Sequence, residues 1–226
     1  MNTLGFERLE DRVLLAASIS KKGCLTVCGT DCDDCIKIFS PCAGVVVVEV
    51  NGCCETFCGV KEIKVDAKGG CDYVSICNVD ICCGKLSVKG GCGNDCISFD
   101  GCINAKVCVD CGDGCDRVNA ECARFKCGVD IKCGDGNDHC EISRCCFEEC
   151  CSIDCGKGDD CIRACENFCA KDVKILCCAG DDNCHWVSSE TCGKFTCDGG
   201  KGCDSFCDYG SSCGTRVIKN CENAPA

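Results

Sequence analysis

Large and rigid side chains are scarce in this sequence. Its 226 residues include only 2 Pro, 1 Trp, 2 Tyr, 9 Phe and 1 Met. A thick globular core is hard to fill without large side chains, whereas a narrow interior can be lined by Val, Ile and Cys. The length allows either one solenoid or one large domain, and the composition favours the solenoid.

Positive charge and long apolar segments are also limited. Lys and Arg number 24 against 36 Asp and Glu, so the formal net charge is −12. Binding to a nucleic-acid duplex needs Lys and Arg to neutralise phosphates, which argues against such a partner. The longest run of β-branched residues, Val45 to Val48, is far shorter than the roughly 20 apolar residues of a membrane span. We therefore expect no nucleic-acid partner and no membrane-spanning segment.

Glycine and aspartate, by contrast, recur together at a fixed period. The clearest copies of the motif Gly-Gly-x-Gly-x-Asp are GGCGND at residues 90–95 and GDGND at residues 134–138. The aspartates that mark the motif and its variants are Asp34, Asp72, Asp95, Asp116, Asp138, Asp160, Asp182 and Asp204. From Asp95 on they are separated by 21, 22, 22, 22 and 22 residues. Such a period indicates a repeat architecture in which each unit stacks on the next.

Apolar residues alternate on both sides of each marking aspartate. They stand nine and seven residues before it and two and four residues after it, as Val107, Val109, Val118 and Ala120 do around Asp116. Alternation by two is typical of a strand whose apolar side faces inward. A third column, thirteen residues before the aspartate, contains Cys82, Ile103, Phe125, Phe147 and Cys169.

These columns predict an all-β fold, a right-handed parallel β-helix (β-solenoid) with about 22 residues per coil. The predicted solenoid occupies residues 18–221, and residues 222–226 form a tail. Between Asp34 and Asp72 the spacing widens to 38 residues and contains two strand-like segments. We therefore predict an extra coil there that lacks the Gly-Asp turn.

Residues 1–17 contain no cysteine and differ from the repeats. Phe6, Leu9 and Val13 recur at helical spacing, which predicts an amphipathic helix that caps the open first coil. The segment LEDRVLL at residues 9–15 resembles the L-E-P-R-x-L-L signature at the N-termini of planctomycete surface and exported proteins, with Asp11 in place of Pro. This resemblance implies an exported protein located in the cell envelope or outside the cell.

The Gly-Asp turn itself has two interpretations. In the first, the glycines adopt positive φ and the aspartate accepts hydrogen bonds from backbone amides of the turn. In the second, the motif resembles the calcium-binding repeats of RTX proteins. That resemblance implies calcium ligands at Asp95, Asp116, Asp138, Asp160, Asp182 and Asp204. Oxygen donors suit Ca²⁺, although RTX motifs recur every nine residues and this motif occurs once per coil.

The 39 cysteines suggest either a disulfide framework in an oxidising compartment or bound metal. One column lies five residues before the aspartates and comprises Cys111, Cys133, Cys155 and Cys177. Disulfides between neighbours in this column and buried free thiols are both compatible with stacked coils. Zinc is less favoured, because the two histidines lie 46 residues apart and the Cys-x-x-Cys pairs have no second pair at the usual distance.

Catalytic motifs are absent from the sequence. No Ser-His-Asp arrangement, phosphate-binding loop or dinucleotide motif is present. Asp100, Glu121 and Glu141 are predicted to lie near one another, with Arg117 and Arg163 close by, but charged residues on an outer strand face are usually only solvated. We therefore expect no enzymatic activity.

Taken together, these patterns suggest a secreted, cysteine-rich structural protein that is stabilised by disulfides or thiol ladders. Most of the chain resembles the Gly-Asp repeat domains of large planctomycete surface proteins. Open coil ends and outer thiols favour self-association, end to end or side by side. The alternative is a repeat module that binds calcium or soft metal ions; the motifs specify no cofactor, and Ca²⁺ is the one that they allow.

Overall fold

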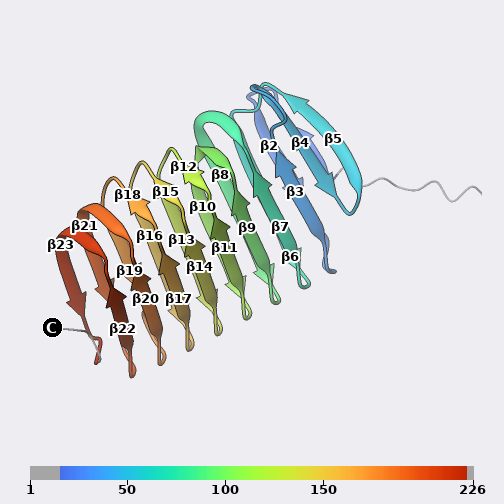
Figure 1. Cartoon of the computed structure of the whole chain (residues 1–226). Helices are drawn as coiled ribbons and strands as arrows, with labels where there is room; N and C mark the ends of the chain where they lie inside the picture. The colour runs from blue at the N-terminus through green and yellow to red at the C-terminus, as the bar shows by residue number, and fades with distance from the viewer. Residues whose placement is uncertain (1–15, 223–226) are drawn as a thin grey trace, which may run out of the picture.

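The computed structural model describes residues 16–222, which form a rod of stacked β-strands (Figure 1). All of the secondary-structure elements in this range are strands. The described residues contain no helix long and apolar enough to cross a membrane. The predicted all-β fold is therefore confirmed.

The strands belong to two sheets. The 13-stranded sheet, called sheet A, comprises β1 (Ala17–Ile19), β2 (Cys24–Cys28), β6 (Glu62–Gly69), β8 (Asp80–Cys92), β10 (Cys102–Asp113), β12 (Arg124–Phe125), β13 (Val129–Asp135), β15 (Cys146–Phe147), β16 (Cys151–Lys157), β18 (Phe168–Cys169), β19 (Val173–Leu176), β21 (Glu190–Asp198) and β23 (Ser212–Lys219). The 10-stranded sheet, called sheet B, comprises β3 (Cys35–Phe39), β4 (Val45–Val50), β5 (Cys53–Cys58), β7 (Tyr73–Cys77), β9 (Cys96–Asp100), β11 (Arg117–Glu121), β14 (His139–Ser143), β17 (Cys161–Cys165), β20 (Asn183–Val187) and β22 (Ser205–Tyr209).

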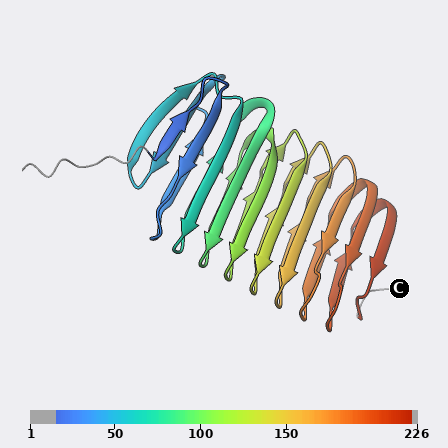
Figure 2. The same ribbon diagram turned by 180° about the vertical axis from the view of Figure 1, so that it is seen from behind.

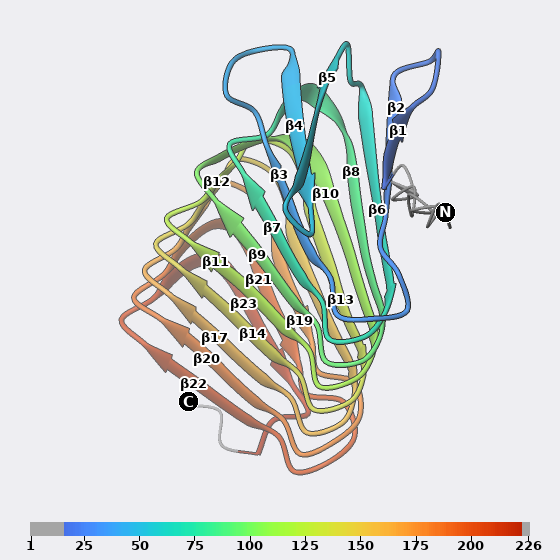
Figure 3. The same cartoon turned by 90° about the vertical axis from the view of Figure 1, so that its right-hand side faces the viewer.

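Each coil contributes strands to sheet A before its Gly-Asp turn and a strand to sheet B after it. Figure 2 shows the same stack from behind, and Figure 3 shows it along the rod, where the coils lie over one another. The strands β1, β2, β4 and β5 lie at one end of the rod, and β22 and β23 lie at the other. The interior between the sheets is narrow, as expected for a chain with few large side chains.

Residues one repeat apart are spatial neighbours, as predicted. In sheet A, Val107 pairs with Val129, Val129 with Cys151 and Cys151 with Val173, all in parallel register. All four side chains are buried. Because burial of apolar surface contributes roughly 25 cal/mol per Å², such columns drive the stacking. The parallel β-solenoid is confirmed, and its right-handed sense stays a prediction.

The predicted extra coil between Asp34 and Asp72 is wrong. The strand β3 pairs directly with β7 in parallel register, so the two coils are neighbours. The intervening strands β4 and β5 instead form an antiparallel hairpin beside β3. The turn that joins β4 to β5 contains Asn51 and Gly52, both with positive φ. An Asn-Gly pair between two strands is the strongest local signal for a hairpin, and the sequence interpretation overlooked it.

Antiparallel strands cover the N-terminal end of the described stack. In sheet A, β1 pairs antiparallel with β2, and in sheet B the β4–β5 hairpin covers β3. Such additions protect the open edge of a sheet. The predicted capping helix falls on residues 1–17, of which 1–15 lie outside the described residues; Ala17 begins β1, so a helix through residue 17 is not supported. Residues 223–226 of the predicted tail also lie outside the described residues.

The third predicted column is confirmed except at its first position. Ile103, Phe125, Phe147 and Cys169 are buried, and the rings of Phe125 and Phe147 stack 5.0 Å apart. Cys82, however, is exposed and has positive φ. The reason is a shift in the pairing of β8 with β10: Asn104 pairs with Asp80 and Ala105 with Gly84, so residues 81–83, with Cys82 among them, have no partner in β10.

Candidate functional site

The Gly-Asp corners of successive coils are stacked in close contact. Gly114, Gly136 and Gly158 have φ of +151°, +141° and +125°. A Cβ on Gly136 would lie 1.7 Å from the carbonyl oxygen of Gly114, and a Cβ on Gly158 would lie 2.0 Å from that of Gly136. Glycine is therefore required at these positions for two reasons: φ is positive, and the carbonyl oxygen of the preceding coil leaves no room for a Cβ.

The marking aspartates form one buried line, which we call the aspartate row. It consists of Asp34, Asp72, Asp95, Asp116, Asp138, Asp160, Asp182 and Asp204, each 2–4% exposed. From Asp34 to Asp182, the backbone N–H of each aspartate donates a hydrogen bond to Oδ1 of the aspartate in the following coil, at 2.7–3.0 Å. The hydrogen-bond ladders of the two sheets are interrupted at each corner. The row gives one backbone amide of each corner a hydrogen-bond partner there.

The second carboxylate oxygen of the row is left without a partner. From Asp72 to Asp204, Oδ2 is buried and accepts no hydrogen bond. Burial raises the pKa of Asp138 to about 6, of Asp116 and Asp182 to about 7 and of Asp160 to about 8, against the opposing effect of the backbone hydrogen bond. At pH 7 Asp160 is therefore mostly protonated and Asp116 and Asp182 about half protonated, which reduces the negative charge buried along the row.

A second polar line runs outside the first, at the residue before each aspartate. Here the hydrogen bonds run in the opposite direction along the rod. The backbone N–H of Asp159 donates to Oδ1 of Asn137 at 3.0 Å, and that of Asp181 donates to Oδ1 of Asp159 at 2.8 Å. Asp159 and Asp181 are exposed or half-buried, whereas the aspartate row is enclosed.

The six predicted calcium ligands all belong to the buried aspartate row. Each Oδ1 from Asp116 to Asp204 already accepts a backbone hydrogen bond. Within residues 16–222, no three side chains of His, Cys, Asp or Glu are grouped as a metal site. The geometry matches the first interpretation of the motif, a turn held by its aspartate, and calcium binding stays a prediction.

The predicted cysteine ladder forms a buried line beside the aspartate row. Cys111, Cys133, Cys155 and Cys177 are each 0–1% exposed and carry free thiols. They occupy matching positions of neighbouring strands, because the residues that flank them pair in register from β10 through β13 and β16 to β19. Contact with the thiols of neighbouring coils, together with burial, raises the pKa of Cys111 and Cys155. We call this line the cysteine column.

The side chains of the cysteine column face the unpartnered oxygens. The equivalent position of the preceding coil is Gly90, where a Cβ would lie 2.4 Å from Oδ2 of Asp95. The cysteines thus lie against the aspartates of their own coils; burial and, to a smaller extent, the nearby Cys133 raise the pKa of Asp138. The period alone located both lines, but only the stacked coils show that they face each other.

The one disulfide of the described residues joins two other cysteines, Cys83 and Cys127. Their Cα atoms are 6.1 Å apart although the residues are 44 apart in sequence, and both sulfur atoms lie close to Asn104 of the intervening coil. Neighbour disulfides within the cysteine column, which the sequence left open, are not formed. The bridge occurs beside the register shift between β8 and β10, where the regular period fails, so periodicity could not locate it.

Removal of this bridge is expected to destabilise the chain by about 4 kcal/mol, the chain-entropy value for a loop of this length. The test is denaturant unfolding of a variant with Cys83→Ser and Cys127→Ser, without reductant. A matched variant with Cys115→Ser and Cys203→Ser changes two exposed free thiols and is expected to unfold like the wild type. Equal midpoints for all three proteins would contradict the bridge.

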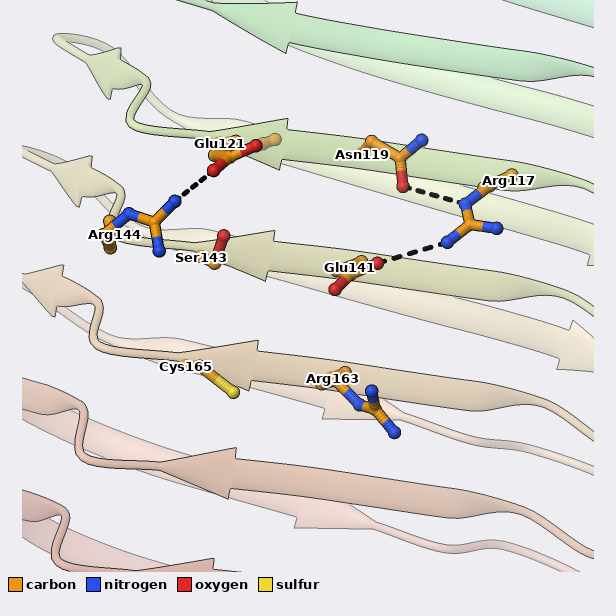
Figure 4. Close-up of a pocket in the computed structure, with 9 residues that line it drawn as sticks. Arg117, Asn119, Glu121, Glu141, Ser143, Arg144, Arg163 and Cys165 are labelled. Atoms are coloured by element: carbon orange, nitrogen blue, oxygen red, sulfur yellow. Dashed lines mark hydrogen bonds and ion pairs between the residues drawn. The ribbon is translucent and has the colours of Figure 1, made fainter.

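Charged residues line a surface groove of about 500 Å³ on sheet B (Figure 4). Four of the five residues singled out in the sequence line it, namely Arg117, Glu121, Glu141 and Arg163. The fifth, Asp100, lies beside Glu121 in the adjoining hollow. The sequence interpretation missed Arg144, which is carried by the corner after β14 and has positive φ.

The charges of this groove are largely paired with one another. Arg117 Nη2 lies 3.2 Å from Glu141 Oε2, and Arg144 forms an ion pair with Glu121. All four side chains are about half exposed, so each pair contributes at most about 1 kcal/mol. These pairs match the interpretation of a solvated strand face, and the absence of enzymatic activity stays a prediction.

Comparison with known proteins finds no similarity. No family model matches the chain, and no curated protein and no solved structure matches it. The functional argument therefore depends on the residues of this chain.

Proposed function

We propose that this chain is a secreted structural β-solenoid that assembles with further copies of itself in the cell envelope or outside the cell. The observation that carries the proposal is the open edge at one end of the rod. The strands β22 and β23 each pair on one side only, with β20 and β21 respectively. An unpaired edge is a template for another chain.

Exposed thiols accompany both ends of the rod. Cys53, Cys54 and Cys58 are exposed on β5, the edge strand of sheet B at the N-terminal end. At the other end Cys203 is exposed and Cys207 on β22 is half-buried. When one rod follows another, these thiols approach each other and can form intermolecular disulfides. The resemblance of residues 9–15 to an export signature supports an oxidising location in which such bridges persist.

The function is tested by following the molecular mass of the full-length chain with and without reductant. We expect oxidation to yield disulfide-linked oligomers that return to monomers when the bridges are reduced. Mass spectrometry after alkylation, with and without prior reduction, identifies the bridged cysteines. A protein that stays monomeric under oxidising conditions would contradict the proposal.

A pair of matched variants distinguishes end-to-end from side-by-side assembly. Cys53→Ser, Cys54→Ser and Cys58→Ser together remove the thiols of the end strand β5. Cys92→Ser, Cys115→Ser and Cys122→Ser remove three exposed thiols from the middle of the rod. We expect the first variant to lose the oxidised oligomers and the second to keep them, because end-to-end assembly brings β5 of one rod next to the open edge of another.

A further inference from the structure

We propose that the cysteine column binds soft monovalent metal ions of the Cu(I) class, one between each two neighbouring thiols. The proposed sites lie between Cys111 and Cys133, between Cys133 and Cys155, and between Cys155 and Cys177. They are independent of secretion and of self-association. They also differ from metal binding by surface thiols, because the column is enclosed.

The spacing of the coils matches two metal–sulfur bonds in line. Neighbouring strands of a sheet lie about 4.8 Å apart. A metal–thiolate bond is about 2.3 Å long for zinc, so a linear sulfur–metal–sulfur unit spans about 4.6 Å. The column presents its donors along a line rather than around a point, in agreement with the lack of three grouped ligands in residues 16–222. Linear coordination by two thiolates is typical of Cu(I), and soft thiolate ligands select it.

The column has a defined length, and water is excluded from it. The equivalent positions of the coils before it are Ala67 and Gly90, and that of the coil after Cys177 is Gly199. None of these residues has a donor side chain, so this position of the coils carries four thiols; beyond them, the buried thiol of Cys197 contacts that of Cys177. The four cysteines are 0–1% exposed. Bound ions would therefore be shielded from water and from chelators.

The aspartate row moderates the charge of such a site. Three monovalent cations and four thiolates leave one negative charge, and each inner thiolate bridges two ions. Oδ2 of Asp116, Asp138, Asp160 and Asp182 lies beside the column without a partner. An Oδ2 that carries a proton can donate a hydrogen bond to sulfur, which satisfies the carboxyl and stabilises the thiolate.

Binding exchanges protons for metal ions without a change of oxidation state. Each thiol gives its proton to solvent as its sulfur bonds the metal, so uptake is expected to release protons. The column is sealed in the folded rod, so the ions must enter while the coils assemble. The experiment therefore has to load the protein during folding.

The test refolds the full-length chain from denaturant under anaerobic, reducing conditions with Cu(I), and then adds excess bathocuproine disulfonate. This chelator removes Cu(I) from accessible thiols. We expect about three copper ions per chain to resist the chelator until the protein is unfolded. Copper content is measured by native mass spectrometry, and luminescence of shielded Cu(I)–thiolate units provides a second readout. Complete removal of copper from the folded wild type would overturn the proposal.

Two double variants separate the cysteine column from other buried thiols. Cys133→Val with Cys155→Val breaks every site of the column. Cys145→Val with Cys169→Val also replaces two buried cysteines, which occupy other positions of the coils, outside the cysteine column. We expect the first variant to lose the chelator-resistant copper and the second to keep it. Equal copper in both variants would overturn the proposal.

A smaller change keeps the test decisive if the first double variant does not fold. Cys177→Val removes only the last site of the column, so resistant copper is expected to fall from about three ions to about two. Circular dichroism establishes that each variant is folded. An unchanged copper content in folded Cys177→Val would likewise count against the column.

Discussion

Raising the pH from about 5 to about 8 is expected to destabilise the folded chain by at least about 3 kcal/mol. Burial raises the pKa of Asp138 to about 6 and that of Asp160 to about 8, whereas an unfolded aspartate titrates near 3.9. The folded state thus keeps protons that the unfolded state releases. This stabilisation is complete below about pH 4 and is lost as the pH rises through about 6 to 8. Urea unfolding across this range measures the effect.

Neighbouring aspartates supply a matched pair of variants for this test. Asp160→Asn keeps an oxygen that can accept the backbone hydrogen bond of Asp138 but removes the titrating group, so it is expected to reduce the pH dependence. Asp159→Asn changes the adjacent exposed aspartate, whose Oδ1 also accepts a backbone amide. It is expected to leave the pH dependence unchanged.

The same experiment tests calcium binding. Calcium requires ionised carboxylates, so a calcium-bound row would gain stability with rising pH and with added Ca²⁺. We expect Ca²⁺ to have little effect on unfolding near pH 7. Calcium-dependent stabilisation that disappears with Asp138→Ala and Asp160→Ala would contradict a protonated row.

The substitution Gly136→Ala is expected to have one of the largest effects of a single added methyl group among the described residues. The added Cβ would lie 1.7 Å from the carbonyl oxygen of Gly114, and φ at this residue is +141°. Both the steric overlap and the backbone conformation oppose alanine. We expect a loss of at least about 3 kcal/mol in the free energy of unfolding, or failure of the neighbouring coils to stack.

Gly128→Ala is the control for this prediction, because Gly128 lies in the same coil. Its added Cβ would approach only the carbonyl oxygen of Cys150, at 3.7 Å, and φ is not positive. We expect the stability of this variant to stay within about 1 kcal/mol of the wild type. Urea unfolding of both variants measures the difference. Similar losses in the two would show that the corners are not in close contact.

The position of the candidate site followed from the sequence, but its inner geometry did not. A constant offset from each aspartate placed Cys111, Cys133, Cys155 and Cys177 in one line. The same offset could not reveal the hydrogen bond from each aspartate amide to the following coil. That bond depends on how the corners are offset along the rod, which is a property of stacked coils and not of one repeat.

The period of about 22 residues determined the parallel solenoid and its buried columns, because like residues must align when identical units stack. Only the tertiary structure decided the features that break the period. Val45–Val50 forms a strand in either interpretation, but its antiparallel pairing with β3 depends on the hydrogen bonds between Asn51 and Cys35 and on the open edge that it covers. The Cys83–Cys127 bridge likewise depends on a local shift between β8 and β10. The repeat specifies the strand pairing and the buried columns that all neighbouring coils share. Where the repeat is interrupted, the structure of the segment depends on its contacts with the strands around it.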